Sequence, residues 1–272
     1  MTDRQAELKA SLATVRARIA TACAAAGRDP GEVTLVAVTK TFPVSDIMLL
    51  SQLGVADIGE NRDSEAAPKA AACAAAGLPV RWHFVGQLQV NKVASVAGYA
   101  DMVHSVDRSR LIDALGSRAR SAGRVISCLV QVSLDDPGEL AGRGSAGRGS
   151  ASQSGASQSG ASQSGAIQSG ASQSGPGRGG AAPAEVGDLA AAIAAHDGLR
   201  LAGVMGIAPL DQPARPAYAR LAQIAETVRA AYPGAQVISA GMSGDMGEAI
   251  AEGATHVRIG TALLGGRPPF LR

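Results

Sequence analysis

The sequence predicts an α/β protein whose fold is a closed, parallel (β/α)8 barrel. Eight short apolar runs alternate regularly with stretches of helical character, and glycine or polar residues follow most of the runs. The chain of 272 residues is long enough to bury the core of one large domain. An open, doubly wound sheet is the alternative. It would usually have fewer strands and a Gly-x-Gly-x-x-Gly turn after the first, which this chain lacks.

The first half of the barrel follows from its local patterns. Residues 4–26 resemble a leading amphipathic helix. Residues 33–38 form an almost unbroken run rich in β-branched residues, which is typical of a strand buried on both faces. Further strands are expected at residues 55–59, 80–85, 101–106 and 125–132. Helices are expected between them: one from Pro43 to near Gly54, an alanine-rich one ending near Gly77, a short one from Val90, and one over residues 108–122.

The second half repeats the same alternation. We expect helices over residues 184–195, 213–231 and 245–252, and strands over residues 199–205, 236–240 and 255–259. With these elements placed, no long stretch outside one unusual segment is left unassigned, which favours eight strands in a single barrel.

The unusual segment runs from Gly142 to Gly180 and contains almost only Gly, Ser, Ala, Gln and Arg, with Gly-Ala-Ser-Gln-Ser recurring every five residues. Such a composition cannot bury enough apolar surface to offset the entropy of ordering, so we expect disorder. We therefore treat residues 141–182 as a low-complexity insertion after strand five, within one domain that spans residues 1–272. A tolerated loop expansion is favoured over a partner-binding segment, because long surface insertions cost little.

Composition narrows the functional classes. The formal charge of +2 gives no reason to expect nucleic acid or an anionic membrane as a partner. Cys23, Cys73 and Cys128 are odd in number and widely spaced, which fits reduced thiols rather than a disulfide framework or a metal site. No long apolar span occurs, and the first residues begin a polar helix rather than a signal peptide. We expect a soluble, cytoplasmic protein.

Lys40 ends the first strand, where a parallel barrel binds its ligands. A partly desolvated ammonium has a lowered pKa, and the free amine can attack a carbonyl group. One interpretation is therefore a lysine that forms a Schiff base. The other is a lysine whose ammonium simply reaches solvent at the end of a strand.

Glycine and hydroxyl residues follow the last two strands, in Gly241-Met242-Ser243-Gly244 and in Gly260-Thr261. Backbone N–H groups, hydroxyls and a helix N-terminus together can bind an anion. In barrels the phosphate site usually lies after strands seven and eight. The alternative is ordinary helix capping, with Ser243 capping the helix at 245.

Other polar residues at the strand ends have two interpretations each. Arg258 is either one half of an ion pair in the barrel mouth or a contact to a pyridine nitrogen. His83 is either a hydrogen-bonded core residue or a site residue, and Asn61 is a possible helix cap. Trp82 is interpreted as packing, with stacking on the ring of a ligand as the alternative. His104, His196 and His256 are too scattered in the sequence to indicate a metal site.

Five motifs in register resemble the pyridoxal phosphate homeostasis proteins, also known as the proline synthase co-transcribed family. The resemblance runs from the first strand to the end of the chain and fails only over residues 141–182. The motifs are Ala37-Val38-Thr39-Lys40-Thr41, Gly59-Glu60-Asn61, Trp82-His83-Phe84-Val85-Gly86-x-Leu88-Gln89-x-Asn91-Lys92, Gly241-Met242-Ser243-x-Asp245-Met246 and Val257-Arg258-Ile259-Gly260-Thr261-Ala262-Leu263-Leu264-Gly265.

This resemblance implies a barrel like the alanine racemase N-terminal domain, with pyridoxal 5′-phosphate (PLP) held as a Schiff base on Lys40. It implies that Ser243, Gly260 and Thr261 bind the phosphate, that Met242 supplies backbone, and that Arg258 approaches the pyridine nitrogen. The ring site would be lined by Asn61, His83 and Met205. Arg62, Gly206 and Gly244 depart from the family pattern, which bears on contacts at the edge of the site.

The resemblance implies a role in intracellular PLP (vitamin B6) homeostasis and amino-acid balance, without an established turnover. Apo forms of PLP enzymes would be partners, and we expect a monomer. A weak PLP-dependent amino-acid racemase is the alternative. It would need an acid or base on each face of the cofactor. Related racemases bring one as a tyrosine from a separate β-domain, whereas Tyr99, Tyr218 and Tyr232 here lie in predicted helices or at helix ends.

Overall fold

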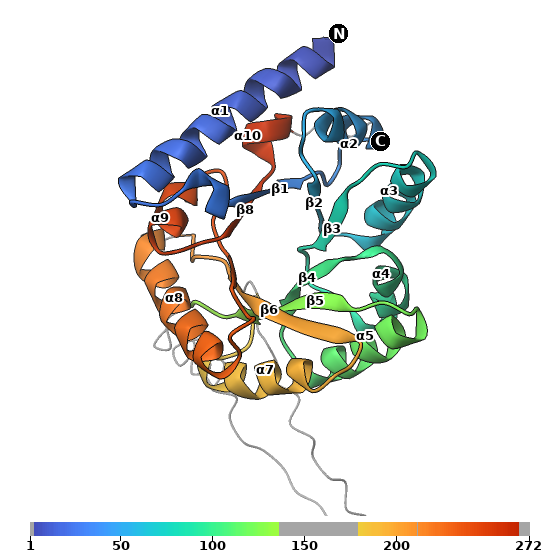
Figure 1. Ribbon diagram of the computed structural model, residues 1–272, viewed down its shortest axis with the longest axis vertical. Helices are drawn as coiled ribbons and strands as arrows, with labels where there is room; N and C mark the ends of the chain where they lie inside the picture. Colours follow the sequence, from blue (N-terminus) through green and yellow to red (C-terminus); the bar gives the residue numbers. More distant parts are fainter. Residues whose placement is uncertain (1–2, 136–178, 211, 267–272) are drawn as a thin grey trace, which may run out of the picture. The chain divides into compact units, whose positions relative to one another are not determined.

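Eight parallel strands close into a barrel surrounded by helices in the computed structural model, which describes residues 3–135, 179–210 and 212–266 (Figure 1). The strands follow one another around the barrel in sequence order, and β8 pairs with β1. The predicted barrel is therefore confirmed, and the open sheet is excluded. The strands are β1 (Thr34–Val38), β2 (Asp57–Glu60), β3 (Arg81–Phe84), β4 (Met102–Val106), β5 (Ile126–Val132), β6 (Leu199–Gly206), β7 (Val237–Ser239) and β8 (His256–Ile259).

The helices form the outer ring. Most begin one to three residues after the predicted start, because the turn or 3-10 residues that precede them were included in the prediction. The helices are α1 (Asp3–Ala25), α2 (Val44–Gln52), α3 (Asp63–Ala75), α4 (Val93–Tyr99), α5 (Ser109–Ser121), α7 (Val186–Ala194), α8 (Ala214–Ala231), α9 (Met246–Ala251) and α10 (Thr261–Leu264), with 3-10 turns η1 (Pro30–Glu32), η2 (Val90–Lys92) and η3 (Pro183–Glu185).

The core lies between the strands and the helices. Trp82 points outward from β3 and packs edge-on against Tyr99, with the ring centroids 6.2 Å apart, so its interpretation as packing is confirmed. Its neighbour His83 points into the barrel, as the alternation of side chains along a strand requires. The barrel interior therefore carries polar groups beside a small apolar cluster that includes Leu129, Ala202 and Met205. The two larger apolar clusters pack between the strands and the helices.

Gly203 marks an irregularity in β6, where the register against β5 shifts between Cys128 and Leu129. Its φ is +148°, and a Cβ atom there would lie 1.9 Å from the carbonyl oxygen of Val237. Only glycine lets β6 and β7 approach in this way.

Residues 179–182, at the end of the predicted insertion, belong to the same compact unit as the barrel. Ala181 forms a parallel bridge with Val132, and its backbone bonds to Gln131 and Ser133. The predicted end of the insertion at residue 182 is therefore too late by a few residues, because composition alone does not reveal this short pairing. Residues 136–178, which hold the repeats, lie outside the described residues.

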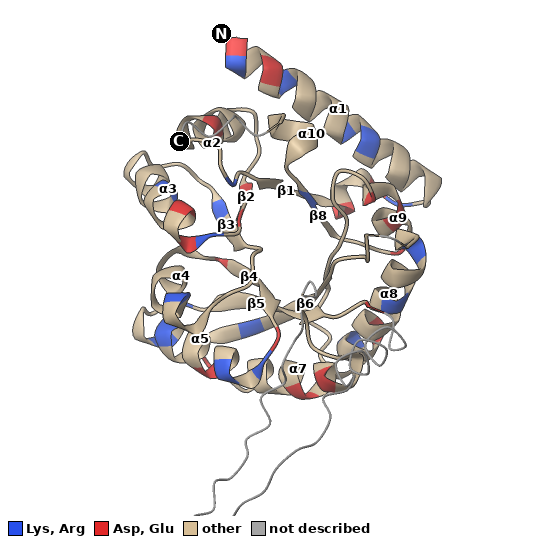
Figure 2. Cartoon of the chain, turned by 180° about the vertical axis from the view of Figure 1, so that it is seen from behind, with Lys and Arg blue, Asp and Glu red and all other residues tan. Residues whose placement is uncertain are grey.

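The distribution of charged residues and the state of the cysteines do not indicate a particular function. Figure 2 shows basic and acidic residues around the whole ring of helices, in keeping with the formal charge of +2. The three cysteines are free and buried, as expected. Among the described helices, none is long and apolar enough to cross a bilayer.

Candidate functional site

Lys40 lies in the turn that follows β1, at the carboxyl end of the barrel, and its side chain is half-buried. Within the described part of the chain, no hydrogen bond or ion pair engages its ammonium group. The next residue, Thr41, has a φ of +69°, a conformation that a β-branched residue rarely adopts. Thr41 also has a buried hydroxyl without a partner. Strain and unpaired polar groups of this kind are concentrated at functional sites.

The two loops predicted to bind an anion meet beside β1. The backbone N–H of Ala262 donates to the Ser243 hydroxyl at 3.4 Å, which joins the loop after β7 to the start of α10. Gly260 lies against Val38, since a Cβ atom at Gly260 would be 3.4 Å from the Val38 carbonyl oxygen. The phosphate-binding pattern and the end of the lysine strand are therefore adjacent.

The alternative role of Ser243 as a helix cap is wrong. The residue at the N-terminal boundary of α9 is Asp245, and no side chain caps the helix. The backbone N–H of Met242 donates to Asp245 at 2.6 Å, so the predicted use of that group for phosphate remains a prediction. The Thr261 amide at the start of α10 has no acceptor among the described residues and is free to bind an anion.

Arg258 points into the barrel from β8 and is 6% exposed. Its Nη1 donates to the Ser239 hydroxyl at 2.6 Å and its Nη2 to the Gly206 carbonyl at 3.0 Å. Within residues 3–135, 179–210 and 212–266, no carboxylate pairs with it, so the ion-pair interpretation is wrong. Burial lowers the pKa of Arg258, and the nearby Tyr218 and Asp245 oppose that change. The barrel mouth therefore holds a buried guanidinium whose direct acceptors are neutral.

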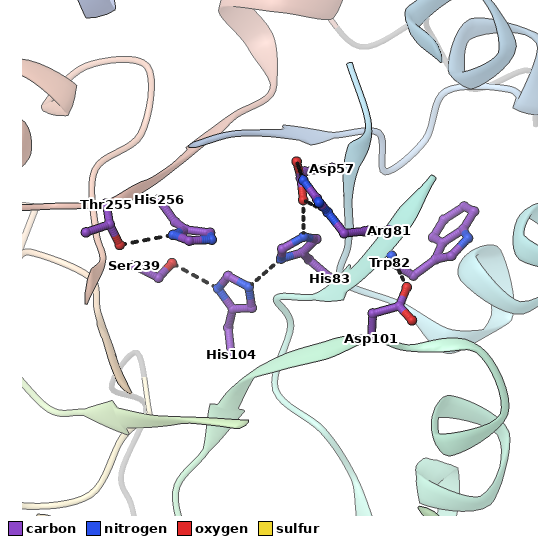
Figure 3. Close-up of polar contacts among 9 residues, drawn as sticks. All are labelled: Asp57, Arg81, Trp82, His83, Asp101, His104, Ser239, Thr255 and His256. Carbon is purple, nitrogen blue, oxygen red and sulfur yellow. Dashed lines mark hydrogen bonds and ion pairs between the residues drawn. The ribbon is translucent and has the colours of Figure 1, made fainter. Parts of the chain in front are cut away.

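A chain of hydrogen bonds crosses the barrel interior (Figure 3). His83 Nε2 lies 2.9 Å from Asp57 Oδ1, His83 Nδ1 lies 2.9 Å from His104 Nε2, and His104 Nδ1 lies 2.9 Å from the Ser239 hydroxyl. Because the Ser239 oxygen already accepts from Arg258, its proton is available to His104. One consistent assignment of the protons follows. The Ser239 hydroxyl donates to His104 Nδ1, His104 Nε2 donates to His83 Nδ1, and His83 Nε2 donates to the Asp57 carboxylate.

The electrostatics agree with this assignment. Burial and the nearby His83 lower the pKa of His104 well below its ordinary value. Burial would raise the pKa of Asp57, but hydrogen bonds from His83 and Arg81 outweigh it and lower that pKa. His104 therefore stays neutral and Asp57 stays ionised at neutral pH.

His83, His104 and His256 are far apart in the sequence but lie close together inside the barrel. The ring of His83 lies 5.2 Å from that of His104 and 6.1 Å from that of His256, between centroids. His104 and His256 thus both lie near His83, whereas His196 lies elsewhere, against Gly116. No group of three metal-ligating side chains occurs in the described part of the chain. Inward alternation along β3 and β4 was the signal that could have found this cluster.

The predicted ring contacts come from β2, β3 and β6, of which β2 and β3 are neighbours in the barrel. Asn61 follows β2 and has a buried side-chain oxygen without a partner, while Met205 is buried at the end of β6. Asn61 does not cap α3, whose N-cap position is Arg62. His83 reaches the same interior, but both of its ring nitrogens are engaged by Asp57 and His104, which leaves its ring face for contact.

These features fit a ligand that carries both a phosphate and a carbonyl group. An unpaired amine lies at one strand end, the two loops predicted to bind an anion lie beside it, and a guanidinium and an unpaired amide oxygen lie in the barrel mouth. Each group is complementary to a different part of such a molecule.

Comparison with known proteins agrees with the fold. A family model described as alanine racemase, N-terminal domain, matches residues 170–268. The pyridoxal phosphate homeostasis protein of Mycobacterium tuberculosis is 39% identical over 97% of this chain and 95% of its own. PipY of Synechococcus elongatus, whose structure was solved with PLP bound, superimposes with a TM-score of 0.67 at 26% identity, covering 95% of this chain and all of PipY. Alanine racemase from Streptomyces lavendulae shares the fold, with a TM-score of 0.63 at 17% identity over 95% of this chain and 56% of its own.

Proposed function

The chain belongs to the pyridoxal phosphate homeostasis protein family, and we propose that it binds PLP with Lys40 as the covalent anchor. The observation that carries this proposal is the half-buried, unpaired ammonium of Lys40 beside the two anion-binding loops. When bound, the cofactor supplies an electrophilic carbonyl carbon and an electron-withdrawing ring.

The remaining residues divide the work of holding the cofactor. The Ser243 hydroxyl, Gly260 and the free Thr261 amide would bind the phosphate, with Met242 beside them. Asn61, His83 and Met205 would line the ring. Arg258 would face the ring nitrogen, and a permanently charged donor there favours an unprotonated nitrogen.

We propose that the protein acts in PLP homeostasis as a carrier that holds and releases the cofactor. In this role it works in the cytoplasm as a monomer and delivers PLP to apo forms of PLP enzymes. The open carboxyl end of the barrel supports this, because Lys40 is partly exposed and a receiving amine can reach it.

An amino-acid racemase is the second candidate, and Lys40 together with Arg258 favours it. Such an enzyme needs a second proton donor or acceptor facing the substrate. The Tyr218 hydroxyl donates to Asp245 at 2.7 Å, and Tyr99 packs against Trp82. Tyr232 ends α8 on the outer ring. This arrangement favours the carrier.

The first test compares the absorbance of the wild type with that of Lys40→Ala after incubation with PLP. We expect a band near about 420 nm in the wild type that is absent in the variant, since this band is typical of PLP held as a protonated Schiff base. Borohydride reduction followed by peptide mapping should place the label on Lys40. Lys9→Ala, on the exposed face of α1, is the matched control and should retain the band. A wild type without the band would refute PLP binding at this lysine.

The carrier and the racemase differ in α-proton exchange. Incubation of the loaded protein with a panel of amino acids in deuterated water should leave their α-protons in place. Exchange that depends on Lys40 would establish the racemase instead.

A further inference from the structure

The turn that carries Lys40 is attached to α3 by charged side chains. The backbone N–H of Thr41 donates to Glu65 Oε2 at 2.7 Å. On the other side of Lys40, Lys69 Nζ donates to the Thr39 carbonyl at 3.0 Å. The backbone on either side of Lys40 is therefore held by two residues one helical turn apart on the same helix.

Glu60 links these two contacts into one network. Its Oε1 accepts from Lys69 Nζ and from the Thr39 hydroxyl, both at 2.7 Å, and Lys69 Nζ also lies 3.9 Å from Glu65. Burial raises the pKa of Glu60, while the contact with Lys69 lowers it. Charged groups that leave water are costly unless each is paired, so this network needs Lys69 in place.

The same turn is under strain. A φ of +69° is strained for a β-branched residue, and such a conformation persists only where the surrounding structure enforces it. The hydrogen bond from the Thr41 amide to the Glu65 carboxylate is charge-assisted, and it directly fixes the strained residue. Without that bond the turn can relax, and Lys40 would lose its fixed direction.

We propose that Glu65 and Lys69 are positioning residues that hold the strained turn of residues 39–41, so that the Lys40 amine faces the anion-binding loops. The inference rests on the proposed function only for the chemical role of Lys40. We call the contacts of Glu65 and Lys69 with the backbone of residues 39–41 the clamp, and these contacts join protein groups only.

The experiment compares Glu65→Ala, Glu65→Gln and the control Glu226→Ala. The control removes a solvent-exposed glutamate that lies away from the ends of α8. Two quantities are measured in the full chain. The first is the hydrogen-exchange rate of the Thr41 amide, by NMR, without added PLP. The second is the rate at which borohydride traps PLP on Lys40.

Glu65→Ala should raise the Thr41 exchange rate and lower the trapping rate, each by about tenfold, since a hydrogen bond to a charged group is lost. Glu65→Gln keeps an acceptor oxygen and should remain within about threefold of the wild type, as should Glu226→Ala. Circular dichroism and the thermal midpoint check that each variant is folded.

An unchanged Thr41 exchange rate in Glu65→Ala would overturn the clamp. Equal changes of both rates in Glu65→Ala and Glu65→Gln would also overturn it, because the acceptor oxygen of residue 65 would then not hold the turn. Faster exchange with unchanged trapping would overturn the positioning role. If the wild type traps no PLP, the proposed function fails, and the exchange rates still decide whether the clamp exists.

Discussion

His256 and His104 are neutral imidazoles inside the barrel, and their protonation links the stability of the fold to pH. Burial and the nearby His83 lower the pKa of His256 to about 4. An unfolded histidine titrates near about 6.5. Between these pH values His256 is protonated in the unfolded chain but neutral in the folded chain. The free energy of unfolding therefore falls as the pH drops from about 6.5 to about 4.

We expect the free energy of unfolding to decrease on acidification through this window. His256 alone should contribute about 2 kcal/mol after allowance for its partial exposure. His256→Gln removes this titration, so its loss of stability between pH 7 and pH 4.5 should be smaller than that of the wild type. Urea unfolding at both pH values measures the difference, and identical losses would contradict the role of His256.

Residues that directly follow a strand were predictable from the sequence, whereas residues inside the barrel were not. Lys40, Ser243 and Gly260 lie within four residues of the ends of β1, β7 and β8, so their convergence at one rim follows from the fold class. His104 and Ser239 lie 135 positions apart and bond only because the barrel closes. Glu65 and Lys69 were missed for a related reason, since a helical pattern does not show which carboxylate reaches a neighbouring backbone amide.

At the scale of elements, the loops after β2 and β3 pack so closely that a side chain is excluded. A Cβ atom at Gly86 would lie 2.2 Å from the carbonyl oxygen of Asn61. All eight strands were predictable, because a buried parallel strand is a conspicuous apolar run. The helix α10 was not, because its four residues are too few for a periodic pattern.

Gly86→Ala should therefore destabilise the protein by about 1–3 kcal/mol and displace Asn61 from the ring site. Gly98→Ala, in α4, is the control, because nothing lies within 4 Å of its Cβ position. It should be neutral or stabilising by up to about 1 kcal/mol. Chemical denaturation and the rate of PLP release measure the two effects. A Gly86→Ala protein as stable as the wild type would show that the Asn61 backbone shifts without cost.

At the scale of the whole molecule, the candidate site spans the seam where the barrel closes. Lys40 follows β1, whereas Ser243 and Thr261 follow β7 and β8, and the seam is the pairing of β1 with β8. Outside the seam, α1 packs against α9 and α10 (Figure 1). Arg4 of α1 donates to Asp46 of α2, which follows β1, and to the Leu264 carbonyl of α10, which follows β8. It therefore joins the two sides of the seam. A ligand held by Lys40 and the phosphate loops would join the same two sides from within.

Such a ligand should stabilise the closed barrel against global unfolding by mass action. The free energy of unfolding should rise by about 1.4 kcal/mol for each tenfold increase in free PLP above its dissociation constant. Lys40→Ala removes the covalent link but keeps the phosphate loops, so its titration should begin at a higher PLP concentration. Ser243→Ala should shift the onset in the same direction while keeping the band near about 420 nm. Thermal or urea unfolding over a PLP series measures these onsets. If PLP stabilised the wild type and Lys40→Ala from the same concentration, the lysine would contribute nothing to retention, and binding would depend on the phosphate loops alone.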